Sequence, residues 1–478
     1  MASHRPLLSY VAFVAALLVA SGGNAVRSSR AAEPVKPCRV VVIDKQNRWP
    51  VPLVELRTTD HVRFVSDNAG VIAIDAAEMM GRETWFDVHG HGYTVPKDGF
   101  GFRGVRLTPK LGETLPVEVE RAIIAKRLGR LTGGGLFVES QKLGDEKDWR
   151  DAPLVGCDSV QNAVYGGKMF WAWGDTTFAR YPLGAFHMTS ATTEVRPLPN
   201  FEPPLRPKFD YFLDDKQLPR GVAAMPGEGP TWLTGYVALP DAKGKERLVA
   251  YYRKIKTPLA VYEAGLCVWN DDKRSFEHLK TVWTKSSGKP QPELNVDGHP
   301  AFWTDEAGKK WLLFGNPLPR VRLAPTFEAW QDMANWETLK PQATLDAASE
   351  GSAKSDRKVT PHSGSIAFNK FRGRWVTVFM EKFGKPSVFG ELWYAEANSP
   401  LGPWGPAVKV LSHDNYTFYN PRLHADLTDA KSPVLLLEGT YTTSFADRPQ
   451  PTPRYDYNQI LYRLDLDDSR LAKARGDE

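Results

Sequence analysis

Three acidic residues precede apolar, aromatic-rich runs of the sequence, and their chemistry suits acid–base catalysis. They are Asp158, Glu228 and Asp297. Two carboxyl groups on either side of a glycosidic bond can cleave it when one is protonated and the other is ionised. Carboxylates crowded into a narrow site repel one another, which raises one pKa and supplies the acid. The alternative is that each acid only caps a turn or a strand end.

Further polar and aromatic residues lie near the same run starts and could contact a substrate. The predicted contacts are Asp175, Trp173, Trp232, His299, His362, Asn420 and Arg422. Asp175 follows an apolar run, in a loop position of the kind that often carries functional groups. Tryptophan faces could stack on a sugar ring, although core packing is the better explanation for most tryptophans. We expect this set to line one pocket with the three acids.

The elements that position these residues recur along the chain as a loose repeat. Each unit begins with a polar loop, continues through an apolar strand and a turn, and enters a second aromatic-rich strand. The residues that open the units are Asp158, Glu228, Asp297, His362 and Asn420, which are 70, 69, 65 and 58 residues apart. Four strands of about six residues plus turns fit each interval. Five such sheets around an axis would form an all-β propeller; a pair of irregular β-sandwiches is the alternative.

The first unit shows this pattern clearly. Aromatic and β-branched residues from Val164 to Trp173 flank the pair Gly166-Gly167, which predicts a β-hairpin. In a propeller the first strand of each unit is the innermost one, so the loops that enter these strands would crowd one mouth. The predicted innermost strands lie near Ala163, Trp232, Ala301, Ala367 and Leu423.

With these loops, residues 151–470 resemble the five-bladed β-propeller glycoside hydrolases of the arabinanase, xylosidase and invertase type. The resemblance implies that Asp158 is the base or nucleophile, and that Asp297 tunes the pKa of the acid. It implies that Glu228, in the segment Gly227-Glu228-Gly229-Pro230, is the proton donor. The segments D-S-V-Q, W-G-D-T and Y-P-L-G are also similar to those of secreted proteins from planctomycete-type bacteria, a resemblance that carries no function.

The position of the glutamate departs from the family pattern. In the family the glutamate normally follows the second aspartate and lies in the fourth blade, whereas Glu228 lies in the second unit. The fourth unit opens instead with His362-Ser363. Glu391 and Glu438 are therefore alternative proton donors.

The N-terminal part of the chain predicts a separate, small β domain. Residues 37–108 contain alternating strands, a tight turn at Asp67-Asn68-Ala69-Gly70 and the segment His89-Gly90-His91-Gly92-Tyr93. These features resemble the carboxypeptidase regulatory-like domain, a transthyretin-like β-sandwich, which implies an accessory module without catalysis. Residues 109–150 are predicted to be a linker or junction, within which residues 116–129 could form a strand or a short helix.

Two further motifs carry little weight. His89 and His91 have the H-x-H spacing of some metal sites, but the sequence places no third ligand, so no metal site is predicted. Residues 99–104 match G-x-G-x-x-G but are not followed by a helix, as a dinucleotide site requires. The predicted chemistry needs no cofactor, although acids and histidines at the propeller mouth could also hold a structural Ca²⁺.

Composition and the N-terminus limit the class of protein. The chain has 478 residues, 42% of them hydrophobic and 24% charged, which fits a globular protein of two or three domains. Residues 1–25 resemble a secretory signal peptide, with Arg5, an apolar stretch from Leu8 to Val19 and a small-residue cleavage site. A stretch of about 12 apolar residues is too short to span a bilayer, which needs about 20. We therefore expect a secreted or periplasmic protein without an integral membrane segment.

Charge and cysteines narrow the class further. The net charge of +5 is spread along the chain without a basic stripe, so nucleic acid is not a predicted partner. The cysteines are Cys38, Cys157 and Cys267. An odd number allows at most one bridge within the chain, and buried packing is the expected role of each.

The sequence thus predicts a secreted glycoside hydrolase that acts on a polysaccharide or oligosaccharide. The competing prediction is a non-catalytic carbohydrate-binding or scaffold propeller with the same aromatic mouth. Carbohydrate is the partner in both cases, and no oligomeric state is predicted. The carboxylates that share one axial pocket would distinguish the two.

Overall fold

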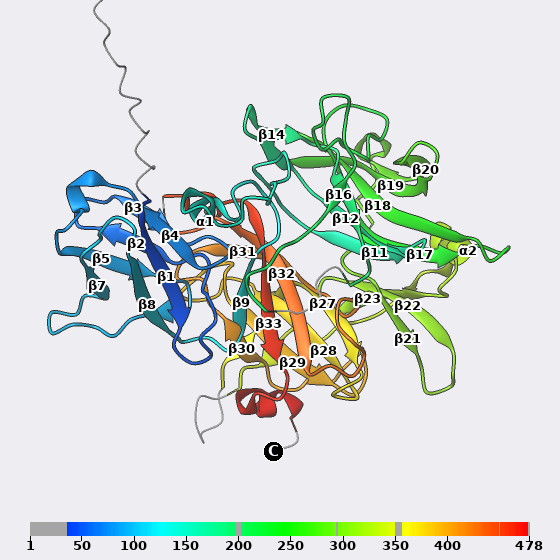
Figure 1. The fold of residues 1–478 in the computed structure, drawn as a ribbon. Coiled ribbons are helices and arrows are strands. Elements are labelled where there is room, and N and C mark those ends of the chain that lie inside the picture. Colours follow the sequence, from blue (N-terminus) through cyan, green and yellow to red (C-terminus); the bar gives the residue numbers. More distant parts are fainter. Residues whose placement is uncertain are drawn as a thin grey trace, which may run out of the picture. The chain divides into compact units, whose positions relative to one another are not determined.

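The structure is a computed structural model that describes residues 36–196, 202–257, 259–292, 295–348, 356–448 and 450–476. The predicted signal peptide at residues 1–25 lies outside the described residues. Lys36–Glu478 form one compact unit, which is mostly β (Figure 1). No helix among the described residues is long and apolar enough to cross a membrane.

The N-terminal part forms two four-stranded sheets. The first has the order β4 (Val71–Ile74), β1 (Cys38–Asp44), β8 (Thr114–Arg121) and β6 (Tyr93–Thr94), and the second has the order β3 (Arg63–Val65), β2 (Glu55–Thr58), β5 (Thr84–His89) and β7 (Gly104–Leu107). β1 alternates buried and half-buried residues along its length, as expected for a strand with one face on a core. β1 and β8 run parallel, whereas the other pairs are antiparallel.

Five four-stranded antiparallel sheets follow in chain order. The first is β11 (Gln161–Tyr165), β12 (Lys168–Trp173), β15 (Thr189–Thr193) and β16 (Asp210–Tyr211); the second is β17 (Thr231–Pro240), β18 (Glu246–Lys256), β19 (Ala260–Asn270) and β20 (Ser275–Thr284). The third is β21 (Ala301–Thr304), β22 (Lys310–Gly315), β23 (Pro319–Leu323) and β24 (Glu337–Thr338); the fourth is β27 (Pro361–Asn369), β28 (Arg374–Glu381), β29 (Leu392–Ala397) and β30 (Val408–Leu411). The fifth is β31 (Thr417–Leu423), β32 (Val434–Thr442), β33 (Asn458–Asp465) and β9 (Lys126–Arg130).

The remaining elements are short. Two small sheets consist of β10 (Gly156–Cys157), β13 (Thr176–Phe178) and β14 (Tyr181–Ala185), and of β25 (Leu345–Asp346) and β26 (Lys358–Val359). The α-helices are α1 (Val138–Lys142) and α2 (Phe327–Gln331), and the 3₁₀ turns are η1 (Ala77–Met79), η2 (Lys285–Ser287), η3 (Met333–Asn335) and η4 (Ser469–Arg475). The regular elements of the described chain are therefore almost all strands, as the sequence predicts.

The predicted first strands of the repeating units each begin a sheet. Ala163, Trp232, Ala301, Ala367 and Leu423 lie in β11, β17, β21, β27 and β31 respectively. The predicted hairpin is also present, since Tyr165 pairs with Lys168 across a turn made by Gly166 and Gly167. Both glycines have positive φ, at 56° and 75°, which matches the twist of a two-residue hairpin turn.

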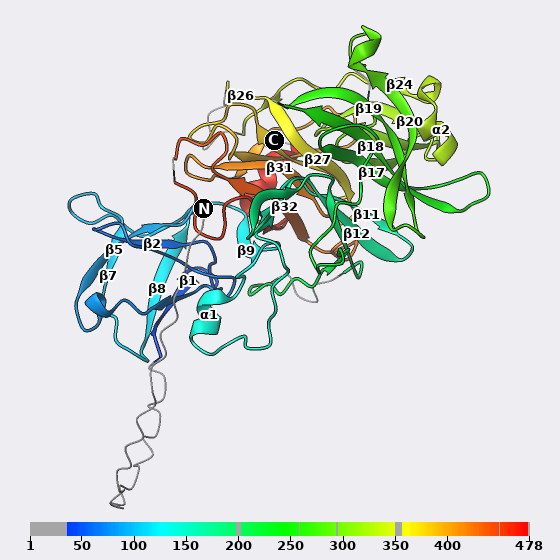
Figure 2. The same ribbon diagram turned by 90° about the horizontal axis from the view of Figure 1, so that it is seen from above.

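The predicted junction at 109–150 is divided between the two parts of the fold. β8 lies in the first N-terminal sheet, where it pairs with β1. β9 instead forms the outer strand of the fifth sheet beside β33 (Figure 1), and in the second view its label lies near that of β32 of the same sheet (Figure 2). Residues 116–129, which could have been a strand or a helix from the sequence, thus supply strands to two different sheets.

One apolar core joins the N-terminal sheets to the last two sheets. This core contains side chains from Cys38 to Ala125 together with others from Val376 to Ala474. Arg127 lies at this junction and is 1% exposed. Its guanidinium donates to the carbonyl oxygens of Pro52, Gly90 and His91 at 3.0, 2.8 and 2.6 Å. The N-terminal sheets are therefore packed into the rest of the fold.

Candidate active site

A cavity of about 290 Å³ lies where the first strands of the sheets meet. Its walls come from the loops before β11 and β21, from β17, β18 and β31, and from the turns after β12 and β22. β27 reaches the wall indirectly, because the backbone N–H of Gly364 donates to Oδ1 of the lining residue Asn316 at 2.8 Å. The lining residues include Asp158, Ser159, Gln161, Gly174, Trp232, Arg253, His299, Asn316, Tyr419 and Asn420.

Among the described residues that line this cavity, one has a carboxylic acid side chain, and it is Asp158. It lies in the loop between β10 and β11, and its backbone carbonyl accepts from the N–H of Gly174 at 2.7 Å. The Tyr419 hydroxyl on β31 donates to Asp158 Oδ2 at 2.6 Å. A Cβ at position 174 would lie 2.0 Å from Asp158 Oδ1, so the glycine of the W-G-D segment makes room for this carboxyl group.

The environment of Asp158 makes its carboxyl group titrate in the weakly acidic range. The pKa of Asp158 is raised from 3.8 to about 6, mainly by burial; the hydrogen bond from Tyr419 lowers it, and the negative charge of Asp175 contributes to the rise. Tyr457 also hydrogen-bonds to Asp158 and lowers its pKa. Near pH 6 this carboxyl can therefore either donate or accept a proton, which departs from the expectation that it is only the ionised partner.

Asp175 is placed beside Asp158 by the end of β12. It directly follows Gly174, which lines the cavity. Trp232, at the start of β17, donates its indole N–H to Asp175 Oδ1 at 3.2 Å. Burial raises the pKa of Asp175, and the hydrogen bond from Trp232 lowers it. Asp175 does not itself line the cavity, contrary to the sequence prediction, but its charge raises the pKa of the lining residue Asp158.

Asp297 reaches the cavity through an arginine. Arg253 on β18 donates to Asp297 Oδ2 at 2.8 Å, and Arg253 itself lines the cavity. Both side chains are 28% exposed, so this ion pair is only partly screened by water. Asp297 is therefore placed to hold a guanidinium at the wall, and it is not itself a lining residue.

Two lining residues next to Asp158 and Tyr419 have left-handed backbone conformations. Ser159 has φ of 50° and Asn420 has φ of 49°. Asn420 Nδ2 donates to Ser159 Oγ at 2.7 Å, and the Ser159 N–H donates to Thr440 Oγ1 at 2.9 Å. Such conformations are costly for residues other than glycine and often occur at ligand sites. These bonds hold two polar side chains at the cavity wall.

His299 and Arg422 form a pair beside the cavity. Arg422 Nη1 donates to His299 Nδ1 at 2.5 Å, which requires the neutral ring. Burial lowers the pKa of His299 well below its usual value, and the charge of Arg422 lowers it further. Burial also lowers the pKa of Arg422, to about 10. His299 is therefore neutral and available as a hydrogen-bond partner.

A buried hydrogen-bonded chain connects the same region to the fifth sheet. Arg422 Nη2 donates to the carbonyl oxygen of Asn162 at 2.8 Å, and Asn162 Nδ2 lies 3.0 Å from His424 Nδ1. His424 Nε2 lies 2.9 Å from Glu438 Oε2, and both side chains are 1% exposed. Glu438 is thus used by this chain and does not line the cavity.

The structure does not bring Glu228 to the cavity. Its side chain is 89% exposed, and the charged group nearest to it is Lys256, at 3.8 Å. The loop is held in this orientation because Lys254 Nζ donates to the Gly229 carbonyl oxygen at 2.9 Å and Tyr262 donates to the Glu228 carbonyl oxygen at 2.7 Å. The E-G-P segment therefore presents its carboxylate to solvent.

Other predicted site residues also lie away from the cavity. Trp173 is 1% exposed and packs among Trp171, Phe209 and Tyr211, so it is part of the core. His362 is exposed and lies against Phe389, with ring centroids 5.3 Å apart. Glu391 is fully buried and pairs with Lys409 at 2.6 Å. The alternative donors Glu391 and Glu438 are thus both held in buried pairs.

Several lining residues were not predicted from the sequence. They are Ser159, Gln161, Arg253 and Asn316. Arg253 follows the apolar run Leu248–Tyr252 of β18 and is itself followed by Lys254, so its charge alone does not mark it as a lining residue. Asn316 follows β22 in a turn, and nothing in its local sequence distinguishes it from an ordinary turn residue.

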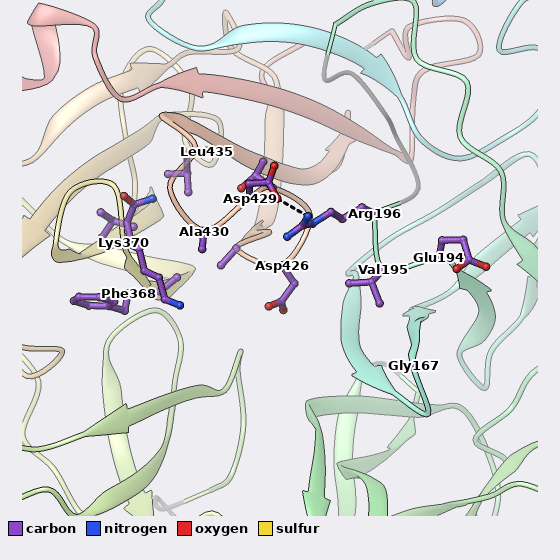
Figure 3. A pocket seen from close by; sticks show the side chains of 15 residues that line it. Gly167, Glu194, Val195, Arg196, Phe368, Lys370, Asp426, Asp429, Ala430 and Leu435 are labelled. Atoms are coloured by element: carbon purple, nitrogen blue, oxygen red, sulfur yellow. Dashed lines mark ion pairs between the residues drawn. The ribbon is translucent and has the colours of Figure 1, made fainter.

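A larger cavity, of about 720 Å³, has a different lining (Figure 3). Arg196 and Asp429 form an ion pair there, and Lys370 and Asp426 lie nearby. The Arg196 and Asp429 side chains are 55% and 78% exposed. Their charges are therefore largely solvated, and this cavity lacks the buried carboxyl pair found near Asp158.

The cysteines are buried and carry free thiols. Burial raises the pKa of the Cys157 thiol well above its usual value, with a further contribution from Asp158. Cys157 is therefore a protonated, inert neighbour of the site rather than a nucleophile. This agrees with the packing role predicted for all three.

The sequence matches no protein-family model and no curated protein. Among solved structures it is similar to an exo-1,5-α-L-arabinanase from a bovine ruminal metagenomic library, with 13% identity, a TM-score of 0.37, and coverage of 66% of this chain and 94% of that one. It is also similar to an α-L-arabinanase mutant from Cellvibrio cellulosa, with 13% identity, a TM-score of 0.38, and coverage of 66% of this chain and 92% of that one. A third similar structure is the native arabinanase of Bacillus subtilis, with 10% identity, a TM-score of 0.34, and coverage of 64% of this chain and 94% of that one. Values this low do not assign an activity.

Proposed function

We propose that the five four-stranded sheets are the blades of a five-bladed propeller, and that its axial cavity hydrolyses a glycosidic bond of an oligosaccharide or polysaccharide. The observation that carries this proposal is the Asp158 carboxyl group, which lines the cavity with a pKa raised to about 6. Two carboxyl groups of different protonation state are what glycoside hydrolysis requires. A side chain that titrates near the working pH is suited to general acid–base catalysis.

In this proposal Asp158 and Asp175 are the carboxyl pair. The charge of Asp175 helps to keep the proton on Asp158, so the favoured state at weakly acidic pH has one neutral and one ionised group. Protonated Asp158 donates to the glycosidic oxygen, and Asp175 acts as the base or stabilises the cationic transition state. This differs from the sequence prediction, in which Glu228 donates, because Glu228 faces solvent.

The other wall residues supply substrate contacts. Arg253, held by Asp297, and Asn420, held by Ser159, present donors with fixed directions to sugar hydroxyl groups. Trp232, whose indole N–H is bound to Asp175, offers a partly buried aromatic face. These contacts would orient a sugar ring over the carboxyl pair.

A carbohydrate-binding role without turnover is the second candidate. It is favoured by the lack of any glutamate among the described residues that line the cavity. The same wall contacts would then bind a glycan, and Asp158 would only accept hydrogen bonds from it.

The test is a hydrolysis assay of the purified chain on a broad panel of aryl glycosides and oligosaccharides. Asp158→Asn and Asp175→Asn should each reduce kcat by about 10²-fold or more while glycan affinity changes little. Glu228→Gln and the exposed turn residue in Asp272→Asn are matched controls and should retain full turnover. Binding without turnover by the wild-type chain would favour the second candidate, and full turnover in Asp158→Asn would refute the catalytic assignment.

A further inference from the structure

A separate cavity, of about 460 Å³, lies between the second N-terminal sheet and the segment that precedes β33. Its lining is rich in arginine and histidine. The lining residues are Leu53, Glu55, Arg57, His61, Arg63, His89, His91, Tyr416, Arg448, Gln450 and Thr452. Three arginines thus face one carboxylate. A cleft lined by charges of one sign concentrates its field on a ligand of the opposite sign.

The single carboxylate of this cavity is already neutralised. Glu55 Oε1 lies 2.6 Å from Arg57 Nη2, and Glu55 Oε2 lies 2.6 Å from Arg63 Nη2. The Glu55 side chain is 7% exposed, and its pKa is lowered because the two arginine hydrogen bonds outweigh burial. Two guanidinium groups therefore share one negative charge, which leaves a net positive charge on the cavity wall.

Three further basic side chains are not used by the protein. Within the ranges that the structure describes, Arg448, His61 and His89 have no ion pair or side-chain hydrogen bond. His91, by contrast, is fixed, because its Nδ1 lies 2.6 Å from the His413 carbonyl oxygen and its Nε2 lies 2.7 Å from the Tyr441 hydroxyl. His91 is thus fixed by its hydrogen-bond partners, whereas Arg448, His61 and His89 are free to contact a ligand.

We propose that this cavity binds the carboxylate or sulfate group of an acidic saccharide. Arginine forks match the geometry of both anions, and charge-assisted hydrogen bonds to them are about twice as strong as neutral ones. The saccharide identity rests on the proposed function, because each cavity has a lining residue from the same short segment at the start of β31. Tyr416 of this cavity and Tyr419 of the catalytic cavity are three residues apart at the start of β31, a distance of about 10 Å.

The segment before β33 also connects the two cavities. The Tyr416 hydroxyl donates to Asp456 Oδ1 at 2.7 Å. The next residue, Tyr457, hydrogen-bonds to Asp158 and lowers its pKa. A glycan chain with one sugar over Asp158 could therefore extend toward the basic cavity and place an acidic substituent there. In this arrangement the basic cavity selects acidic glycans, and the carboxyl pair cleaves them.

The binding test uses calorimetry on the whole chain at low and moderate ionic strength. The probes are an oligogalacturonide, a sulfated galacto-oligosaccharide and a neutral galacto-oligosaccharide of the same length. We expect at least one acidic probe to bind about tenfold more tightly than the neutral probe, with an advantage that shrinks as salt is added. Arg448→Gln should remove most of this advantage, whereas the control Arg82→Gln, an exposed arginine outside the lining, should not.

The outcomes separate this proposal from the catalytic one. Asp158→Asn should retain the preference for the acidic probe even where turnover is lost, so a failure of catalysis leaves the binding result intact. Preference for the carboxylate probe alone or for the sulfate probe alone identifies the anion and supports the site. Equal affinity for acidic and neutral probes would overturn the proposal, as would an unchanged preference in Arg448→Gln.

Discussion

Asp158 depends on Tyr419 for its pKa, and this pair gives a prediction at the scale of single residues. The Tyr419 hydroxyl donates to Asp158 and opposes the rise caused by burial. Tyr419→Phe should therefore raise the pKa of Asp158 above about 6. If Asp158 is the acid, the alkaline limb of the kcat/KM profile should move upward by about one pH unit.

The control is Tyr262→Phe, which removes a hydroxyl bound to the exposed Glu228 loop. Its pH profile should match that of the wild-type chain. An alkaline limb that stays in place in Tyr419→Phe would show that the titrating acid is another group.

The raised pKa of Asp158 also predicts a pH-dependent stability. Because the folded-state pKa is about 6 and the usual value is 3.8, folding favours the protonated form. The corresponding contribution to stability is present below pH 4 and is lost as the pH rises through 6. Asp158→Asn should therefore stabilise the protein at pH 7, by up to about 2–3 kcal/mol, and have little effect at pH 4.

Denaturant unfolding at the two pH values measures this difference. Asp272→Asn, which replaces an exposed turn residue, should change neither value. Destabilisation by Asp158→Asn at pH 7 would mean that the ionised carboxylate is favoured by the fold.

At the scale of elements, β9 supplies the fourth strand of the fifth sheet, although it comes from the N-terminal part of the chain. It adds to the edge of β33, and its Leu128 is fully buried in a core with Trp171 and Leu461. That core joins the first sheet to the fifth. Leu128→Ala should cost about 2–5 kcal/mol of the free energy of unfolding, because it leaves a cavity between these sheets.

Leu401→Ala is the matched control, since Leu401 is 37% exposed and its loss should cost little. Chemical denaturation of both variants at one pH measures the difference. Equal small losses would show that β9 is held by its backbone pairing alone.

Most strands and turns could be predicted from the sequence, whereas the pairing of β9 with β33 could not. The hairpin at Gly166-Gly167 and the five strands that open the sheets follow from apolar periodicity and turn residues, which are local signals. The pairing of β9 with β33 joins residues more than 300 positions apart, and Lys126–Arg130 carries no pattern that names its partner. The same limit applies to Glu228, whose direction is set by Lys254 and Tyr262 from neighbouring strands.

At the scale of the whole molecule, the shared core predicts that the two parts do not fold separately. Removal of residues 36–125 would expose apolar side chains from Val376 to Ala474 and would leave Arg127 without its carbonyl partners. A chain of residues 126–478 should therefore be insoluble or melt well below a chain of residues 36–478. The longer chain should unfold in one cooperative transition.

Calorimetry of both chains checks this expectation. Two separate transitions in the longer chain, or an unchanged transition in the shorter one, would indicate independent domains. The sequence predicts a separate N-terminal domain followed by a linker or junction at residues 109–150. Buried contacts such as those of Arg127 leave no local signal that would have shown otherwise.

The closure of the fifth sheet also fixes an order of events during synthesis. Arg127 and its partner Tyr462 are 335 residues apart in the chain. β9 therefore emerges from the ribosome more than 300 residues before β33. Until then the open edge of β9 is a template for pairing with another chain. A ribosome-bound chain that stops before residue 458 should therefore remain aggregation-prone and bound by chaperones, whereas a chain that includes β33 (Asn458–Asp465) should close the fifth sheet.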